Sequence, residues 1–512
     1  MTPELAILLA MGAPLIGFLG VYLFDKSPNL REAATLISGG AALICTLIVF
    51  QAVGTGARPE LEVFDVVAGL PIAFRAEPLG AMFAVLGAGL WIVNSIYSIG
   101  YMRGHDEPHQ TRFYMCFTIA IASAIGVAYS ANLFTLFVFY EVLTLSTFPL
   151  VTHKGDEKAR NGGRIYLGIL MGTSIGLLLP AVVWTFAIAG TADFAPGGIL
   201  AGKVDEASYI LPVLLGLYAF GIGKAALMPI HPWLPNAMVA PTPVSAFLHA
   251  VAVVKAGVFS LLKVVVYVFG IDLLASSGAG TGYMWIAGVS ILLASAIAMN
   301  KDNLKARLAY STVSQLSYVT LGAMLATSMG VMGGAMQIAM HALGKMTLFM
   351  CAGAIYVGAH KSLVSELKGL GRVMPFTFGA FFIGAMSIVG LPPLGGSWPK
   401  FLLMVGAADA GQLAIIGVLI LSSLMNVAYL LSIPIMAFYL SPDAATDDSR
   451  AKGLDDDLPE GEASRLGVKW GELKEAPILT VIPPILTATG ALLLFFFANG
   501  LYDYLLPITE AG

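Results

Sequence analysis

The sequence predicts an all-α membrane protein with about fourteen transmembrane helices. Of its 512 residues, 58% are hydrophobic and only 11% are charged, and the mean hydropathy is +0.84. A soluble domain carries about a quarter charged residues, so most of this surface must face lipid. Apolar runs of about 20 residues recur along the chain, and a run of that length crosses the core of a bilayer as a helix.

The apolar runs define the expected spans in order. They lie near residues 3–24, 33–53, 78–98, 112–129, 131–152, 164–190, 208–229, 242–269, 282–299, 308–327, 331–358, 373–391, 397–440 and 476–506. The stretch 397–440 is long enough for a half-helix followed by a full span. The first run carries Glu4 and lacks a basic flank, so we expect a retained helix and not a cleaved signal peptide.

The positive charges sort to one side of this fourteen-span arrangement. Nineteen Lys and Arg residues fall on loops of one side: Lys26, Arg31, Arg103, Arg112, Lys154, Lys158, Arg160, Arg164, Lys301, Lys305, Arg307, Lys361, Lys368, Arg372, Arg450, Lys452, Arg465, Lys469 and Lys474. The other side holds Arg58, Arg75 and Lys203. The positive-inside rule predicts that the nineteen are cytoplasmic and that both termini lie outside, in a cell inner membrane.

The remaining cations fall inside apolar runs, and all of them are lysines. They are Lys224, Lys255, Lys263, Lys345 and Lys400, and one acid, Glu141, joins them deep in a run. A charge at the centre of a transmembrane helix costs roughly 2.5–3.5 kcal/mol on insertion scales. A buried lysine can release its proton, whereas arginine cannot. The pattern therefore favours a proton relay.

Two of these residues have plainer interpretations. Lys263 lies near the outer end of its run, so we expect its side chain to snorkel to the membrane surface. Glu141 and Lys224 could form an inert buried ion pair that holds two helices together. Lys345 and Lys400 have no second acid at membrane depth, so an ion-pair interpretation explains them poorly.

The histidines divide in a similar way. His341 stands four residues before Lys345, on the same helix face, and His249 stands six before Lys255. His231 lies against a membrane helix, where a histidine is more often a packing residue than a relay group. We expect the others, in or beside loops, to be solvated: His105, His109, His153 and His360.

Two proline-rich stretches cannot be continuous helices, because proline removes a backbone donor and clashes with the preceding turn. The first contains Pro229 and Pro232, next to Lys224, and the second contains Pro392, Pro393 and Gly395, next to Lys400. Such backbone survives at membrane depth only against protein or a water-filled cavity. Broken helices in corresponding places of two halves are typical of ion-coupled transporters with inverted repeats.

The sequence offers no ligand set for a cofactor. Its three cysteines, Cys45, Cys116 and Cys351, lie far apart, and CxxC, HExxH, GxGxxG and Walker patterns are absent. We therefore expect no metal, no cofactor and no redox or hydrolytic site of its own; electron chemistry or ATP would come from another polypeptide.

Four segments carry a family resemblance: FYEVLTLSTFPLV, GKAALMPIHPWLPNAMVAPTPVSAFLHA, NLKARLAYSTVSQLSYVTLG and HALGKMTLFMCAGAI. They resemble the antiporter-like, proton-translocating membrane subunits of complex I, membrane-bound hydrogenases and Mrp-type sodium/proton antiporters, over residues 75–440. Asn236 departs from the aspartate of many relatives. The chain looks most like the D-type subunit of the Mrp antiporters.

The resemblance implies two inverted five-helix repeats, spans 4–8 and 9–13, with spans 7 and 12 broken. The corresponding units are an N-terminal three-helix segment (1–110), two repeats (111–270 and 282–440), an acidic cytoplasmic loop (441–475) and a C-terminal helix (476–512). We expect that loop to be a solvated linker; the alternative is a surface that docks a partner or collects protons. The resemblance also implies relay roles for Glu141, Lys224, Lys255, His341, Lys345 and Lys400, to which the sequence adds His249. Lysine at 400 argues against the complex I branch that has glutamate there.

These observations predict a proton-translocating subunit of a multi-subunit sodium/proton antiporter, with other membrane subunits as partners. In the expected mechanism, the Glu141–Lys224 pair opens and closes, its charge biases Lys255, and the proton passes through the span-11 groups to Lys400, which releases it at the far side. The alternatives are the pump module of a redox-driven complex and the proton-conducting module of an inorganic-carbon uptake complex.

Overall fold

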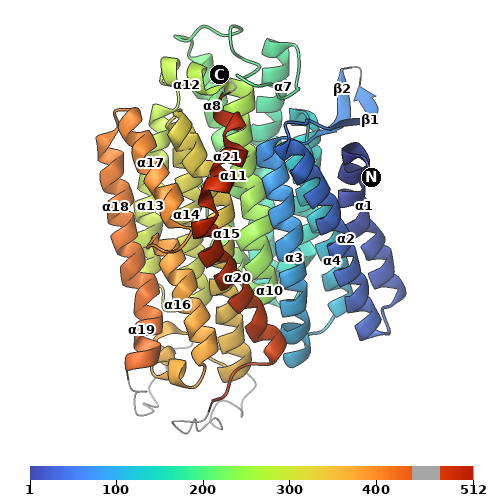
Figure 1. Ribbon diagram of the computed structural model, residues 1–512, viewed down its shortest axis with the longest axis vertical. Coiled ribbons are helices and arrows are strands. Elements are labelled where there is room, and N and C mark those ends of the chain that lie inside the picture. Colours follow the sequence, from blue (N-terminus) through green and yellow to red (C-terminus); the bar gives the residue numbers. More distant parts are fainter. Residues whose placement is uncertain (68, 441–472, 511–512) are drawn as a thin grey trace.

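The protein is a bundle of long, roughly parallel helices (Figure 1). The computed structural model describes residues 1–67, 69–440 and 473–510. The hairpin β1–β2, α12 and the C-terminus lie at one end of the bundle, which we call the hairpin face (Figure 1). The opposite end carries the loops with Arg103, Lys154, Lys301 and Lys361, and we call it the cation face. Most of the acidic loop predicted over 441–475 falls outside the described residues.

In the described residues, the N-terminal half contains six long helices, the last running from α6 through η1 to α7, together with a hairpin and then a broken region. The elements are α1 Pro3–Leu23, α2 Pro28–Gly54, β1 Glu60–Val67, β2 Leu70–Arg75, α3 Pro78–Gly104, α4 Gln110–Tyr129, α5 Leu133–Val151, α6 Glu157–Thr173, the π-helix η1 Ser174–Leu178, α7 Leu179–Ala189, α8 Ile210–Gly221, η2 Gly223–Ala225, α9 Trp233–Asn236, η3 Ala237–Val239, α10 Thr242–Phe247, and the π-helix η4 Leu248–Ala252. β1 and β2 pair antiparallel.

The C-terminal half alternates long helices with one further break. It contains α11 Val253–Val264, the π-helix η5 Val265–Phe269, α12 Ile271–Ser277, α13 Thr281–Met299, α14 Leu304–Met324, α15 Ser328–Ala359, η6 Val364–Leu367, η7 Leu370–Arg372, α16 Pro375–Val389, α17 Ser397–Asp409, α18 Leu413–Asn426, the π-helix η8 Val427–Leu431, α19 Ser432–Tyr439, α20 Ile478–Phe496, α21 Ala498–Leu505 and α22 Pro507–Glu510.

Within the described residues, ten helices are long and apolar enough to cross a membrane, or eleven when the bent pair Val253–Phe269 and Ile271–Ser277 counts as one span. The other expected spans correspond to α8 and α16, which are short, and to α14, which is rich in serine, threonine and tyrosine. The protein is therefore a mostly helical, multi-pass membrane protein. The count of fourteen spans stays a prediction.

Both proline-rich stretches interrupt helices. α8 ends at Gly221, and the chain runs through a short 3₁₀ turn and irregular backbone before α9 begins at Trp233. α16 ends at Val389, followed by Gly390 with φ of +89°, and helix resumes with α17 at Ser397. The left-handed φ of Gly390 suits glycine, which lacks the Cβ that disfavours this region.

The longest helix, α15, forms the centre of the bundle. It spans 32 residues, and 94% of its most apolar window is buried. It packs against α3, α10, α11, α14, α16, α17 and α20. By contrast, α1, α2 and α18 expose large apolar side chains such as Ile16, Ile37 and Leu424. A helix that is buried all round can hold polar groups away from lipid, so α15 is the natural support for a membrane-embedded site.

Candidate functional site

The lysines predicted within the membrane are all buried in the bundle. Lys224 lies in η2, Lys255 and Lys263 on α11, Lys345 on α15 and Lys400 on α17, and none is more than 5% exposed. In all five lysines the charged end stays inside the protein.

Lys224 lies against α5. Its Nζ donates to the Tyr140 carbonyl oxygen at 2.7 Å and to Thr144 Oγ1 at 2.6 Å, and it lies 3.1 Å from the centre of the Tyr140 ring. The Tyr140 hydroxyl in turn accepts from the Lys224 backbone N–H at 3.0 Å. A carbonyl, a hydroxyl and a ring face all favour a cation at this position.

Glu141, the next residue on α5, does not close the predicted ion pair. Its two carboxylate oxygens are buried without a hydrogen bond, and within the described residues no ion pair of 4.0 Å or less joins it to Lys224. The Glu141 charge nonetheless lies close enough to act on Lys224. The structure therefore shows Glu141 and Lys224 as near neighbours with the direct contact open.

α11 passes directly beside the first break. A Cβ added at Gly257 would clash with the Lys224 carbonyl carbon and lie 2.8 Å from the Lys224 Cβ. Only glycine allows this approach, because any larger residue would push the two backbones apart. The glycine thus brings α11, with Lys255 two residues earlier, against the segment that carries Lys224.

Lys255 meets the central helix at a histidine. Its Nζ lies 2.6 Å from His341 Nδ1, while His341 Nε2 is buried without a hydrogen bond. The charges of Lys255, Lys345 and Lys400 are all close enough to act on His341. Lys345, one turn further along α15, donates to the Leu308 carbonyl oxygen on α14 at 3.2 Å. The four groups from α11, α15 and α17 thus share one buried region.

Lys400 occupies the second break. Its Nζ donates to the Val389 carbonyl oxygen at 2.7 Å and to Ser423 Oγ on α18 at 3.0 Å, and it lies 5.2 Å from the Tyr318 ring centre. A Cβ at Gly390 would lie 2.7 Å from Lys400 Cδ. The break thus frees the Val389 carbonyl and leaves room for the lysine side chain beside it.

Lys263 does not snorkel, and the sequence-based interpretation is wrong. The side chain is 1% exposed, and its Nζ lies 3.3 Å from Glu77 Oε2 and donates to the Ser130 carbonyl oxygen at 2.7 Å. The Phe194 ring lies 4.5 Å from the same Nζ. The loop between α7 and α8 folds over η5, the π-helix that follows α11, where the Leu200 N–H donates to the Val268 carbonyl at 3.0 Å, and so closes the route to the surface.

Glu77 is a buried partner that sequence reasoning missed. It stands immediately before Pro78, at the start of a predicted span, where the pattern places it in the loop. The signal for such a partner was Lys263 itself, because a lysine within an apolar run needs a countercharge from another segment. The sequence could not identify Glu77 as that partner without knowing that α3 lies beside α11.

Among the histidines outside the contact with Lys255, one differs from expectation while His109 and His360 are exposed as predicted. His153, expected to be solvated, is 2% exposed, and neither ring nitrogen has a hydrogen bond. Burial, with the nearby Arg112 charge, lowers the pKa of His153 to about 4, so the ring is neutral near pH 7. His231 Nδ1 is also buried without a partner. The side chain of His249 lies outside the described part of the chain.

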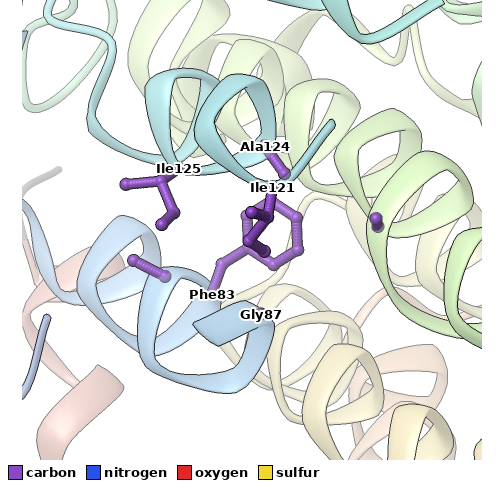
Figure 2. A pocket seen from close by; sticks show the side chains of 7 residues that line it. Phe83, Gly87, Ile121, Ala124 and Ile125 are labelled. Carbon is purple, nitrogen blue, oxygen red and sulfur yellow. The ribbon is translucent and has the colours of Figure 1, made fainter. Parts of the chain in front are cut away.

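Other candidate sites offer less chemistry. A small pocket between α3, α4 and η4 is lined entirely by apolar residues, including Phe83, Ile121 and Ile125 (Figure 2). Among the residues that the structure describes, no group of three His, Cys, Asp or Glu side chains is placed to hold a metal ion. The buried lysines and their partners are therefore the strongest candidate functional site.

Residues 130–426 match the family model described as NADH:quinone oxidoreductase/Mrp antiporter, TM. This chain belongs to that family. The match contains Glu141, Lys224, Lys255, His341, Lys345 and Lys400. These buried groups, which we call the lysine row, therefore lie within the family's shared transmembrane region. The resemblance inferred from the sequence is confirmed.

Members of the family occur under several names. The chain is 30% identical to NADH-quinone oxidoreductase subunit N of Desulforudis audaxviator, over 77% of each chain. It is also 30% identical to a probable K⁺/H⁺ antiporter subunit of the A/B type from Rhizobium meliloti, over 74% of this chain but only 38% of that longer protein.

The fold is also that of a solved relative. A chain in the structure of the Mrp complex from Dietzia sp. DQ12-45-1b superposes with a TM-score of 0.84 at 22% identity, over 100% of this chain and 97% of that one. The protein is thus an antiporter-like membrane subunit with the fold found in multi-subunit membrane complexes.

Proposed function

We propose that this chain is the proton-translocating subunit of a multi-subunit cation/proton antiporter of Mrp type, with Na⁺ as the cation. The observation that carries the proposal is the contact of 2.6 Å between Lys255 Nζ and His341 Nδ1, with Lys345 and Lys400 nearby. A buried lysine and histidine at hydrogen-bond distance can exchange a proton directly, since each has a lone pair when neutral.

The relay works by electrostatics. Lys224 alternates between its contacts with Tyr140 and Thr144 and a contact with the Glu141 carboxylate. The charge of Lys224 changes the proton affinity of Lys255, which lies nearby because α11 packs closely at Gly257. Repulsion between unit charges about 8–10 Å apart is worth roughly 2 kcal/mol at an effective dielectric of about 20. That energy shifts a protonation equilibrium by more than tenfold, so a proton can be driven along the row without large helix movement.

The finer architecture belongs to the same proposal. α8 with η2 and α9, and α16 with α17, form spans 7 and 12 of two inverted five-helix repeats in a fourteen-helix fold. Each break sets one lysine beside freed backbone, which is the arrangement expected where irregular backbone lines an ion route. The cation face is cytoplasmic and both termini lie outside, in the cell inner membrane.

A redox-driven complex is the second candidate, because one relative carries the name NADH-quinone oxidoreductase subunit N. The same lysine row would then serve as the pump module, with electron transfer on other subunits. Neighbouring reading frames separate the two: small membrane subunits without a redox protein indicate an antiporter, and subunits for NADH or nickel–iron centres indicate a pump.

The test is cation-driven proton movement in vesicles that contain the assembled complex. Lys255→Ala should abolish it, because the change removes the amine that exchanges a proton with His341. Lys203 is an exposed lysine on the hairpin face, so Lys203→Ala should match the parent. Na⁺ and K⁺ are compared as the driving cation. Parental transport by an assembled Lys255→Ala complex would refute the relay.

A further inference from the structure

A second buried polar feature lies between α13, α14 and the α18–η8 segment. It consists of Ser295, Ser311, Ser314, Tyr318, Ser422, Asn426 and Tyr429, none of which is more than 1% exposed, and of the half-buried Ser423. We call this set the hydroxyl chain. Buried polar groups in a membrane helix need partners. The number of polar side chains along this helix interface requires an explanation beyond packing.

One end of the hydroxyl chain lies at the cation face. The Tyr429 hydroxyl donates to the Asn426 side-chain carbonyl and lies 3.0 Å from the Ser311 hydroxyl, which can donate to it. The Tyr429 backbone carbonyl accepts from Arg307 Nη1 at 3.3 Å, in the first turn of α14. Tyr429 lies in the π-helix η8, a wider turn that changes the direction of the side chains following Asn426.

The middle of the chain consists of serine hydroxyls from three helices. Ser295 Oγ on α13 lies 3.0 Å from Ser314 Oγ on α14 and 3.5 Å from Ser422 Oγ on α18. It is also near enough to the Tyr429 hydroxyl to interact with it. Ser295 therefore joins the group at the cation face to the group deeper in the bundle.

The other end reaches Lys400. Ser423 Oγ accepts from Lys400 Nζ at 3.0 Å, and the Tyr318 hydroxyl lies near Ser422 and Ser423 without forming a hydrogen bond. Asn426 Nδ2 is likewise buried without a partner. Each of these two polar atoms can bind a bridging water.

We propose that the hydroxyl chain carries protons between the cation face and Lys400. The inference rests on the proposed function and adds a separate proton access to its second half. In the mechanism expected from the sequence, Lys400 releases its proton at the far side; the polar groups that touch Lys400 instead lead back toward the cation face.

The transfer balances at each hydroxyl. A proton arriving at Tyr429 is accepted by its oxygen, and the hydroxyl passes its own proton to the next oxygen. At the inner end Ser423 donates its proton to the lone pair of neutral Lys400, which becomes an ammonium, while one proton has left the medium at the cation face. Ser295 now donates to the Ile291 carbonyl at 2.8 Å, so its hydroxyl must rotate once per proton passed.

Matched variants separate conduction from packing. Tyr429→Phe and Ser423→Ala remove a hydroxyl and keep the shape, whereas Ser423→Thr restores the hydroxyl. Ser317→Ala is the control, because Ser317 is equally buried on α14 but donates only to the Val313 carbonyl of its own helix. Each complex is placed in vesicles with the cation face outward, and loss of protons from the medium is followed under a cation gradient.

We expect Tyr429→Phe and Ser423→Ala to lower the initial rate at least about fivefold, and Ser423→Thr and Ser317→Ala to stay close to the parent. Parental rates in both Tyr429→Phe and Ser423→Ala would overturn the inference, and so would an equal loss in Ser317→Ala. If the parental complex moves no protons under any cation gradient, the proposed function itself fails, which is a different result from selective loss in these variants.

Discussion

Lys224 and Lys400 occupy similar settings with one difference. Each lies at a helix break, donates to a backbone carbonyl and to a hydroxyl, faces a tyrosine ring and packs beside a glycine. The residue that follows the tyrosine is Glu141 beside Lys224 but Val319 beside Lys400. A carboxylate can hold a proton or a countercharge, and valine can do neither.

In the proposed relay, that difference gives the two lysines different roles. Lys224 can remain charged while its proton balance is shared with Glu141, because the pair as a whole is neutral. Lys400 has only neutral dipoles, so its charge is compensated by backbone and hydroxyl groups alone. The first site is suited to switching by an ion pair, and the second to loading and unloading a single proton.

The largest effect is expected for Lys400→Arg. The guanidinium keeps the positive charge but does not lose its proton in proteins, so a site that loads and unloads protons stops working. Proton movement in vesicles should fall to background while the complex assembles at the parental level. Transport retained by Lys400→Arg would mean that this site only needs a fixed cation, and the contrast with Lys224 would disappear.

The next effect concerns stability and separates the two lysines directly. Lys224→Met leaves the buried Glu141 without a countercharge, which should lower the free energy of unfolding by roughly 3–5 kcal/mol, whereas Lys400→Met leaves no acid behind and should lower it far less. Thermal unfolding of the purified complexes measures both.

The double variant Glu141→Gln with Lys224→Met decides what the pair does. It should recover most of the stability because no buried charge remains. If the pair is a switch, proton movement stays absent. Recovery of proton movement together with stability would leave Glu141 with a packing role only.

At a third buried lysine, the expected effect is confined to stability. Lys263 is paired with Glu77 at 3.3 Å and is remote in role from the relay, so Lys263→Met should destabilise by a few kcal/mol, at most about 3–5. Adding Glu77→Gln should restore most of that loss, and transport per assembled complex should stay near the parent. A complete loss of transport in the stable double variant would place this pair in the proton route.

Sequence reasoning located most of the buried charged groups because the cost of a buried charge is visible in the pattern itself. A lysine within an apolar run cannot face lipid, and His341 and Lys345 share a helix face at a spacing of four. The two helix breaks could also be predicted, because proline interrupts a helix through its own local geometry. The structure brings Lys255 into contact with His341, and the order of the relay groups implied by the family resemblance stays a prediction.

The sequence-based predictions failed for residues whose contacts come from distant segments of the chain. Lys263 lies at the end of a run, where snorkelling is the usual outcome, and only the loop between α7 and α8 closes that route. His153 lies two residues beyond the end of α5, yet the ring packs against Phe113 on α4. The hydroxyl chain was also invisible, because serines and tyrosines from three helices read as ordinary packing residues until their contacts are known.

The pairing of Lys263 with Glu77 has a consequence for biosynthesis. Every residue of α11 is buried, and the helix carries two lysines, each of which costs roughly 2.5–3.5 kcal/mol to place in lipid. Glu77, the partner of Lys263 at the start of α3, is translated long before α11, whereas His341, the partner of Lys255, is translated after it. During synthesis α11 can therefore dock on one completed neighbour, but its other lysine must wait near the translocon or at the membrane surface until α15 arrives.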